Sequence, residues 1–163
     1  MNRTLILTAI LLMIQANVPA VASQYQSNAA TQKRPNKHHE KVIAGVRAVL
    51  DAQVEAWNRG DLESFMDGYL RGSETVFVSG DNVVRGWQTV LDRYKKTYDS
   101  REKMGTLAFS ELEITSIGRD AAVALGRWQL TRAGDTPHGR FTLIFRRTAQ
   151  GWRIVHDHTS SAS

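Results

Sequence analysis

The sequence contains no cysteine and no apolar run long enough to cross a membrane. The missing cysteines exclude a disulfide scaffold, a thiolate zinc site and a thiol nucleophile. The longest apolar stretch, residues 5–14, falls short of the roughly 20 residues that a membrane-spanning helix needs. Stability must therefore come from a packed core, and the 42% share of hydrophobic residues is enough to form one. The same composition excludes a chain that is disordered throughout.

Beyond residue 40 the sequence also lacks a strong charge of either sign. The net charge of +5 comes from 21 basic and 16 acidic residues, but four of the basic residues precede residue 41. From residue 41 onward, 17 basic residues face 15 acidic ones, which leaves only +2. A nearly neutral domain of this kind gives little indication of a nucleic-acid-binding face. It also carries no Gly-rich phosphate loop and no nucleophile elbow.

The N-terminus has the pattern of a secretory signal peptide. A basic residue precedes the apolar stretch, and residues 20–22 (AVA) form the small-x-small site that a signal peptidase cleaves. We therefore predict a signal peptide over residues 1–22 and a periplasmic or secreted mature protein; retention as a membrane anchor is the alternative. Residues 23–40 are polar and have no apolar periodicity, which predicts a disordered linker.

The remaining residues, 41–160, predict one α+β domain in which helices come first and most of the strands follow. Gly60 ends the first helix, and Asp61 is the N-cap of the second. Apolar residues recur at the helical spacing of three and four over residues 42–57, 62–69 and 87–98. Alternation with a period of two predicts strands near 75–78, 83–85, 106–116, 121–132, 140–149 and 152–159.

The last four strands are joined by short turns, so they must form an antiparallel meander, because parallel strands need long crossovers. Helices gathered before such a meander pack on one face of the sheet. A curved sheet wrapped around helices should leave a cavity on its concave side, and an apolar cavity with a few polar groups is the default ligand site. The sequence therefore predicts an internal pocket for an apolar or aromatic small molecule.

Several stretches of the domain are similar to a known superfamily. Residues 56–62 (AWNRGDL), Gly86 after the strand at 75–78, and the closing residues 152–160 (WRIVHDHTS) resemble the nuclear transport factor 2-like proteins, and among them the SnoaL-like domains. Residues 118–122 (GRDAA) and the closing strand also resemble the association domain of calcium/calmodulin-dependent protein kinase II. The resemblance implies a cone-shaped, curved antiparallel β-sheet packed on N-terminal helices, an internal pocket, and a homodimer or larger ring.

Two positions depart from the catalytic residues that the resemblance implies. In the ketosteroid isomerases of this superfamily, a tyrosine that stabilises the oxyanion stands where this chain has Gln53, and the general-base aspartate falls near Phe77. An apolar ring cannot take a proton, so the isomerase mechanism is not expected here. The pocket arginines of the kinase association domain correspond to Gln129 and Leu143 in this sequence.

The densest polar cluster of the domain is His156-Asp157-His158 on the last predicted strand. Alternation along a strand places the two histidines on one face and Asp157 on the other, where it is expected to pair with a basic residue. Three interpretations of the histidines stay open. They are polar groups of the pocket, with His158 as a catalytic acid or base; they are a metal pair without an evident third ligand; or they brace the strand end against the first helix. We expect no metal or other cofactor.

Further candidates for ligand binding come from the helices and from the strand at 121–132. Trp57, Tyr69 and Tyr94 lie on apolar helical stripes, where they either fill the core or border the pocket with an N–H or O–H group. Arg127 and Gln129 share one face of the strand, and the resemblance to the kinase association domain favours the concave face for them. Trp128, on the other face, then packs in a dimer interface.

Two function hypotheses follow from the sequence. The first is an exported protein that binds a small apolar or aromatic molecule in its pocket, with acid–base chemistry of the lyase or isomerase type. The second is a dimeric assembly module without catalytic activity, whose outer sheet face forms the interface. Neither hypothesis involves nucleic acid, nor a membrane once the signal peptide has been removed.

Overall fold

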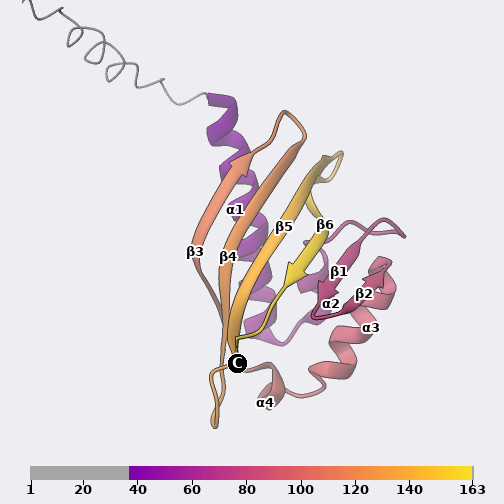
Figure 1. Cartoon of the computed structure of the whole chain (residues 1–163), viewed down its shortest axis with the longest axis vertical. Coiled ribbons are helices and arrows are strands. Elements are labelled where there is room, and N and C mark those ends of the chain that lie inside the picture. Colours follow the sequence, from indigo (N-terminus) through magenta and orange to yellow (C-terminus); the bar gives the residue numbers. More distant parts are fainter. Residues whose placement is uncertain (1–36, 163) are drawn as a thin grey trace, which may run out of the picture. The chain divides into compact units, whose positions relative to one another are not determined.

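The computed structural model describes residues 37–162, which form a curved six-stranded sheet with helices packed on it (Figure 1). The predicted signal peptide and most of the predicted linker lie outside these residues. The helices are α1 (Lys37–Arg59), α2 (Leu62–Met66), α3 (Trp87–Thr97) and α4 (Arg101–Met104). The strands are β1 (Val76–Ser79), β2 (Asn82–Arg85), β3 (Thr106–Ser116), β4 (Ala121–Thr131), β5 (His138–Thr148) and β6 (Gly151–Thr159).

The long helix α1 buries its predicted apolar stripe against the sheet. Val42, Val46 and Leu50 are almost fully buried, and they recur at the spacing that keeps side chains on one helical face. The helix begins at Lys37, so its first turn includes residues that the sequence pattern assigned to the linker. Among residues 37–162, no helix is long and apolar enough to cross a membrane.

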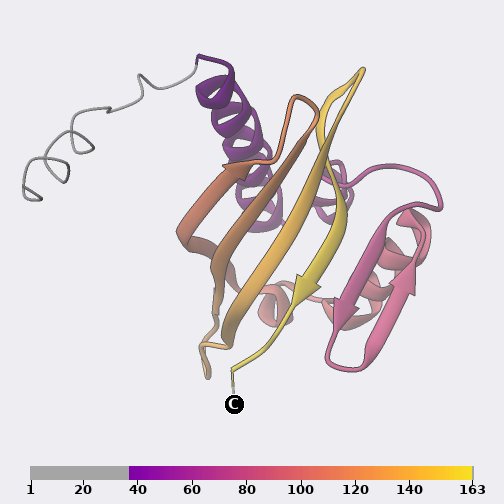
Figure 2. The ribbon, with the colours of Figure 1, turned by 45° about the horizontal axis from the view of Figure 1, so that its top comes forward.

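The strand order β2-β1-β6-β5-β4-β3 confirms the antiparallel meander of the last four strands. The β1–β2 hairpin extends the sheet beyond β6, and Figure 2 shows it beside α3. β1 runs parallel to β6, which the sequence pattern did not predict. Parallel neighbours need a long connection, and here it includes α3, α4 and the rest of the meander. The α+β class and the packing of the helices on the sheet are as predicted.

An irregularity in β3 accompanies the curvature of the sheet. The register with β4 shifts by one residue between Ser110 and Glu113, and Glu111 there takes a positive φ of 52°. A β-bulge of this kind inserts one unpaired residue, bends the strand and increases its twist. Arg140 lies on β5, on the other side of β4, and its guanidinium pairs with the exposed Glu111 carboxylate at 2.5 Å.

Candidate functional site

A cavity of about 150 Å³ lies between the helices and the sheet. A cavity of this volume with apolar walls can hold a single aromatic ring the size of benzene. Aromatic side chains supply half of the residues that line it: Trp57, Phe65, Tyr69, Phe77, Tyr94, Tyr98, Phe109, Trp128 and Phe141. The wall of this cavity is therefore rich in aromatic side chains.

The cavity opens toward the end of the sheet at which β1 and β6 finish. Ser79 is the last residue of β1, Thr159 is the last of β6, and Ser161 follows it; all three line the cavity. Ser161 is exposed, whereas Asp157 farther back on β6 is buried. We call Ser79, Arg93, Thr159 and Ser161 the mouth of the cavity, because these lining residues are polar and at least partly exposed.

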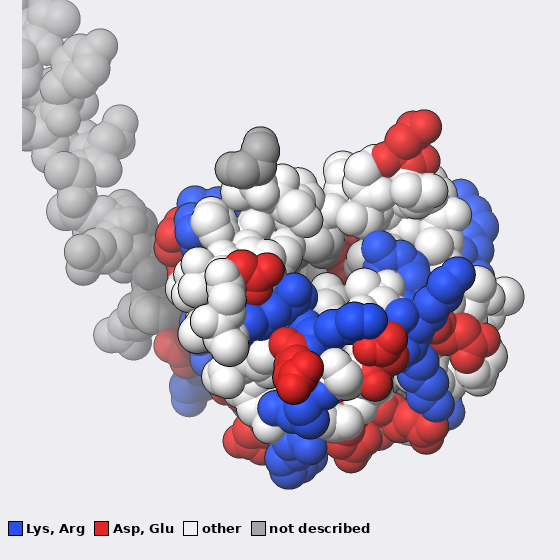
Figure 3. Space-filling model, turned by 90° about the horizontal axis from the view of Figure 1, so that it is seen from below, with Lys and Arg blue, Asp and Glu red and all other residues white. Residues whose placement is uncertain are grey.

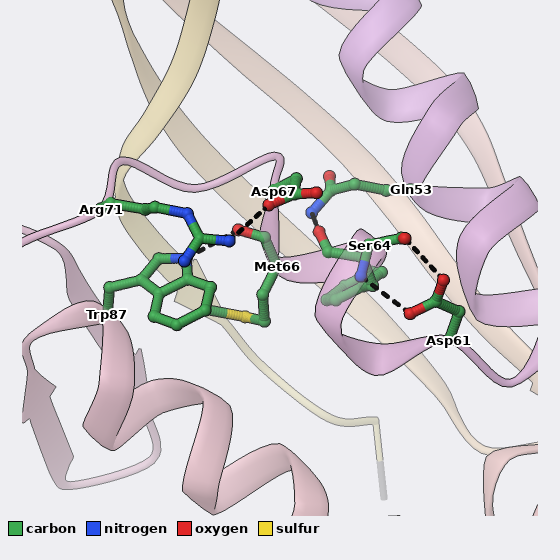
Figure 4. Close-up of polar contacts among 8 residues, drawn as sticks. Gln53, Asp61, Ser64, Met66, Asp67, Arg71 and Trp87 are labelled. Carbon is green, nitrogen blue, oxygen red and sulfur yellow. Dashed lines mark hydrogen bonds and ion pairs between the residues drawn. The ribbon is translucent and has the colours of Figure 1, made fainter.

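Hydrogen bonds to the backbone hold the α2 wall of the cavity in place (Figure 4). Gln53 of α1 donates to the Phe65 carbonyl at 3.1 Å, and the Trp87 indole donates to the Met66 carbonyl at 2.8 Å. The Asp61 carboxylate accepts the Ser64 backbone N–H at 2.9 Å and caps the helix, as predicted. Because both ends of α2 are fixed, the Phe65 ring has a defined place in the cavity wall.

A β-bulge in β6 decides which polar residues of the closing strand reach the cavity. The register with β5 passes from the pair Phe145–Ile154 to the pair Ile144–His156, so Val155 is an extra residue. One extra residue moves every following side chain to the opposite face of the sheet. Before the bulge, Trp152 and Ile154 are buried on the helix side; after it, the buried residue is Asp157.

The two histidines and Asp157 lie on opposite faces, as predicted, but the interpretation of the histidines as pocket residues is wrong. Asp157 lines the cavity, whereas neither His156 nor His158 does, and His158 is exposed. His156 lies on the outer face, where its neighbours in register are Val76 of β1 and Ile144 of β5. Without the bulge at Val155, simple alternation would have placed the two histidines inside. His158 does not line this cavity, so the cavity gives no support to the catalytic role predicted for it.

Asp157 is held by two hydroxyl donors. The Tyr69 hydroxyl donates to its Oδ2 at 2.6 Å, and the Thr159 hydroxyl donates to its Oδ1 at 2.6 Å. Burial in the aromatic cavity raises the pKa of this carboxyl above its ordinary value of 3.8, because the charged form is poorly solvated there. The hydrogen bonds from Thr159 and Tyr69 and the charge of His156 and Arg93 act in the opposite direction and favour the carboxylate.

The two predicted tyrosines form a chain of hydroxyls that ends at this carboxyl. Tyr69 and Tyr94 are both buried, and their hydroxyl oxygens lie 3.5 Å apart. Burial and the nearby charge of Asp157 raise the pKa of both phenols well above 10, so both keep their protons. While Tyr69 donates its proton to the ionised Asp157 carboxylate, Tyr94 is the donor in its contact with Tyr69. A ligand oxygen can compete for that proton.

Trp57 also lines the cavity, as its place on the apolar stripe of α1 predicted. Its indole N–H donates to the Met104 carbonyl at 3.1 Å, which ties α1 to α4. Its ring makes edge-to-face contacts with Phe65 and Tyr98, at centroid distances of 5.1 and 4.7 Å. The roles of Trp57, Tyr69 and Tyr94 in ligand binding stay predictions, but the three residues are brought together at one cavity.

The side chains of β4 also point to the opposite faces from those expected. Trp128 and Leu130 line the cavity, and Arg127 and Gln129 lie on the outer face, half-buried. The Trp128 indole donates to the Ser160 carbonyl at 3.0 Å, so its polar atom is satisfied while its ring covers the cavity. Turning the large apolar side chains inward buries more apolar surface than turning the arginine inward would.

Two charged residues of the cavity were not selected from the sequence as pocket residues. Asp157 was assigned to the opposite face, and nothing in the local sequence marks the bulge that turns it inward. Arg93 of α3 lines the mouth, with its guanidinium 4.4 Å from the centroid of the Phe77 ring. Arg93 directly precedes Tyr94, which lies on an apolar helical stripe. This position beside the stripe is the signal that would have identified Arg93 as a cavity residue. Among residues 37–162, no group of three or more His, Asp or Glu side chains is placed to hold a metal ion.

Comparison with known proteins agrees with this architecture. The family model described as SnoaL-like domain matches residues 46–163. An NTF-2 like protein of unknown function from Shewanella oneidensis MR-1 is 39% identical, with a TM-score of 0.70 over 72% of this chain and 98% of that chain. A ketosteroid isomerase-like protein from Erwinia carotovora atroseptica SCRI1043 is 20% identical, with a TM-score of 0.60 over 74% of this chain and 95% of that chain.

A third structure, a protein with unknown function of the DUF3225 family from Pectobacterium atrosepticum SCRI1043, is 26% identical. Its TM-score is 0.61 over 76% of this chain and 92% of that chain. No curated protein matches the sequence. The match of the family model over most of the folded residues, together with the NTF-2 like relative, establishes the family: the chain belongs to the SnoaL-like domains of the NTF2-like proteins.

Proposed function

We propose that this domain binds a small, ring-bearing molecule in its cavity and that Asp157 performs acid–base chemistry on it, of the isomerase or lyase type. The observation that carries the proposal is the buried carboxyl of Asp157, which faces an aromatic cavity and has a raised pKa. An acid–base group is most effective when its pKa lies near the working pH, and burial moves Asp157 in that direction.

The hydroxyls around Asp157 give each group a defined part in such a reaction. Asp157 takes a proton from a carbon next to a ligand carbonyl, which leaves an enolate, and later returns it to the same carbon or, where a C=C bond is conjugated with the enolate, to the far carbon of that bond. Tyr94 donates its proton as a hydrogen bond to the carbonyl oxygen, on which negative charge develops. Tyr69 holds the Asp157 carboxylate in position. The relative described as ketosteroid isomerase-like is in keeping with this class of reaction.

The binding step is tested with neutral ring compounds that fit the cavity volume. Because Trp57 and Trp128 line the cavity, phenol and cyclopentanone should change the tryptophan fluorescence of the purified full chain in a saturable way. A chain that shows no saturable binding of any ring compound by fluorescence or calorimetry contradicts the proposal. Mass spectrometry of whatever co-purifies with the protein identifies the natural ligand.

The chemical step is tested by proton exchange. The α-protons of cyclopentanone exchange with deuterium from solvent, and NMR measures the rate. We expect the protein to accelerate this exchange and Asp157→Asn to abolish the acceleration while phenol binding persists. Asp120→Asn, which changes a carboxyl in the turn between β3 and β4, at the other end of the sheet, is the matched control and should leave exchange unchanged. If the unmodified protein binds these compounds but does not accelerate proton exchange, the acid–base part of the proposal is refuted and only the binding function remains.

A second function, assembly into a homodimer, has its own supporting observation. On the outer face of the sheet, Leu125 of β4 and Ile144 of β5 are each 38% exposed. Exposed apolar side chains in the middle of a sheet face are typical of an interaction surface. Light scattering of the purified chain should give the mass of a dimer, and a monomer over the micromolar range would refute it. Dimer formation and ligand binding are compatible.

Export of the mature protein to the periplasm or the medium remains part of the proposal. N-terminal sequencing of the protein from the exported fraction should begin at Ser23, directly after the predicted cleavage site. An intact N-terminus in a membrane fraction would instead support the anchored alternative.

A further inference from the structure

Arg93 differs from the other charged residues near the cavity because no carboxylate neutralises it. Among residues 37–162 it forms no ion pair and no side-chain hydrogen bond, and its guanidinium lies against the face of the Phe77 ring. Arg132, the other guanidinium whose charge acts on Tyr98, is paired with Asp135 at 3.7 Å. A planar guanidinium stacked on an aromatic ring keeps its N–H edge available for a partner.

Asp157 does not form an ion pair with Arg93, although the two are the charged residues that line the cavity. Both carboxylate oxygens of Asp157 already accept hydroxyl hydrogen bonds, from Tyr69 and Thr159. The charge of Arg93 lowers the pKa of Asp157 only as the last of several causes, and the two side chains do not come within ion-pair distance. Arg93 is therefore placed at the mouth with its N–H groups unused by the protein.

The rest of the mouth is also rich in donors. Ser79 and Ser161 line it, and within residues 37–162 neither hydroxyl has a hydrogen-bond partner in the protein. Figure 3 views the molecule from the end at which β6 finishes and shows a hollow with Lys and Arg side chains around it, interspersed with Asp and Glu. A hollow with apolar walls and donors of positive charge at its rim favours a ligand that has an apolar body and an anionic end.

We propose that the cavity takes a ring-bearing carboxylate whose ring lies among the aromatic walls and whose carboxylate pairs with Arg93. The inference rests on the proposed function, because it names the chemical class of the ligand for the same cavity. The flat fork of the guanidinium matches a carboxylate with two parallel hydrogen bonds. The carboxylate stays at the mouth, since inside the cavity it would be repelled by Asp157. The single negative charge of such a ligand is balanced by the single positive charge of Arg93.

The test compares acids with their neutral amides, which have nearly the same shape. Calorimetric titrations of the full chain with benzoate and benzamide, and with phenylacetate and phenylacetamide, measure the preference for the charge. We expect the acids to bind about tenfold more tightly or better at low salt, in keeping with one charge-assisted pair. Arg93→Gln should lose that preference and keep its affinity for the amides, and Arg93→Lys should retain part of it because a lysine supplies charge without the fork.

Arg119→Gln is the matched control, because it removes one arginine from the turn between β3 and β4, away from the mouth. It should keep the full preference for the acids. If Arg93→Gln does not fold, the salt dependence of the unmodified chain decides: sodium chloride should weaken the binding of benzoate and leave that of benzamide unchanged. Equal affinity for acids and amides, or a preference that survives in Arg93→Gln, overturns the inference and leaves the proposed function intact. Failure of all four probes to bind counts against the proposed function itself.

Discussion

Replacing Tyr69 with phenylalanine should destabilise the protein by an amount that depends on the charge of Asp157. The change keeps the ring in the cavity wall and removes one O–H group, the donor that lies 2.6 Å from Asp157 Oδ2. A hydrogen bond to an ionised group contributes about 1.5–3 kcal/mol, and one between neutral groups about 0.5–1.5 kcal/mol. We therefore expect a loss of about 2 kcal/mol where Asp157 is ionised and about 1 kcal/mol where it is protonated.

The sign of the pH dependence follows from the pKa of Asp157. In the folded protein burial raises this pKa above 3.8, so the native state binds the proton more tightly than the unfolded chain does. The stability contributed by this group is therefore greatest below pH 3.8 and falls as the pH rises through the raised value. Tyr69→Phe removes a donor that favours the carboxylate and raises this pKa further. The difference between the variant and the unmodified chain should thus grow with pH.

Urea unfolding, followed by tryptophan fluorescence between pH 4 and pH 8, measures these differences. Tyr94→Phe is the matched control: among residues 37–162 its hydroxyl has a hydrogen bond only with Tyr69, at the long distance of 3.5 Å, and the change should cost less than Tyr69→Phe at high pH. In the Asp157→Asn background the loss caused by Tyr69→Phe should no longer change with pH, which a double-mutant cycle reveals. A loss that is the same at all pH values in the unmodified background would refute the reasoning about Asp157.

Three other predictions concern a close backbone approach in β5, the cavity wall and the outer face of the sheet. Gly139→Ala should cost about 2 kcal/mol or more in thermal unfolding, because its methyl group would collide with the Ser160 carbonyl, and an unchanged melting temperature would contradict that. Trp57→Phe should cost about 1–3 kcal/mol in urea unfolding, since it leaves the buried Met104 carbonyl without its donor; a cost near zero would show that water replaces the indole. Leu125→Asp should turn a dimer into a monomer in light scattering with little loss of stability, and a mass unaffected by the change would place any interface elsewhere.

The sequence predicted the regular parts of the fold well because their signals are local and repeated. The alternation along the strands predicted the meander, and the apolar stripe predicted α1. The predicted boundaries are close to those observed. The parallel pairing of β1 with β6 was missed because it joins segments more than 70 residues apart, and no local pattern encodes it. The short helix α4 was missed because four residues are too few to show a helical period.

The candidate site was predicted only where helical spacing determined it. Trp57 and Tyr94 face the cavity because a stripe on a helix has one buried side, and Tyr69 joins them from just beyond α2. On strands, an error of one residue reverses every side chain, and the bulge at Val155 is such a shift. Because of this shift, Asp157 faces the cavity in place of the two histidines. The proposed acid–base group is therefore a carboxyl and not an imidazole.

Asp157 is proposed to be an acid–base group that faces a ligand cavity. Carbon-13 NMR of the labelled Asp157 carboxyl, titrated with and without saturating phenol, follows this group itself. We predict a midpoint above 3.8 for the free protein and a further change of the signal and its midpoint when phenol occupies the cavity. A midpoint at or below 3.8 that phenol does not affect would contradict the claim.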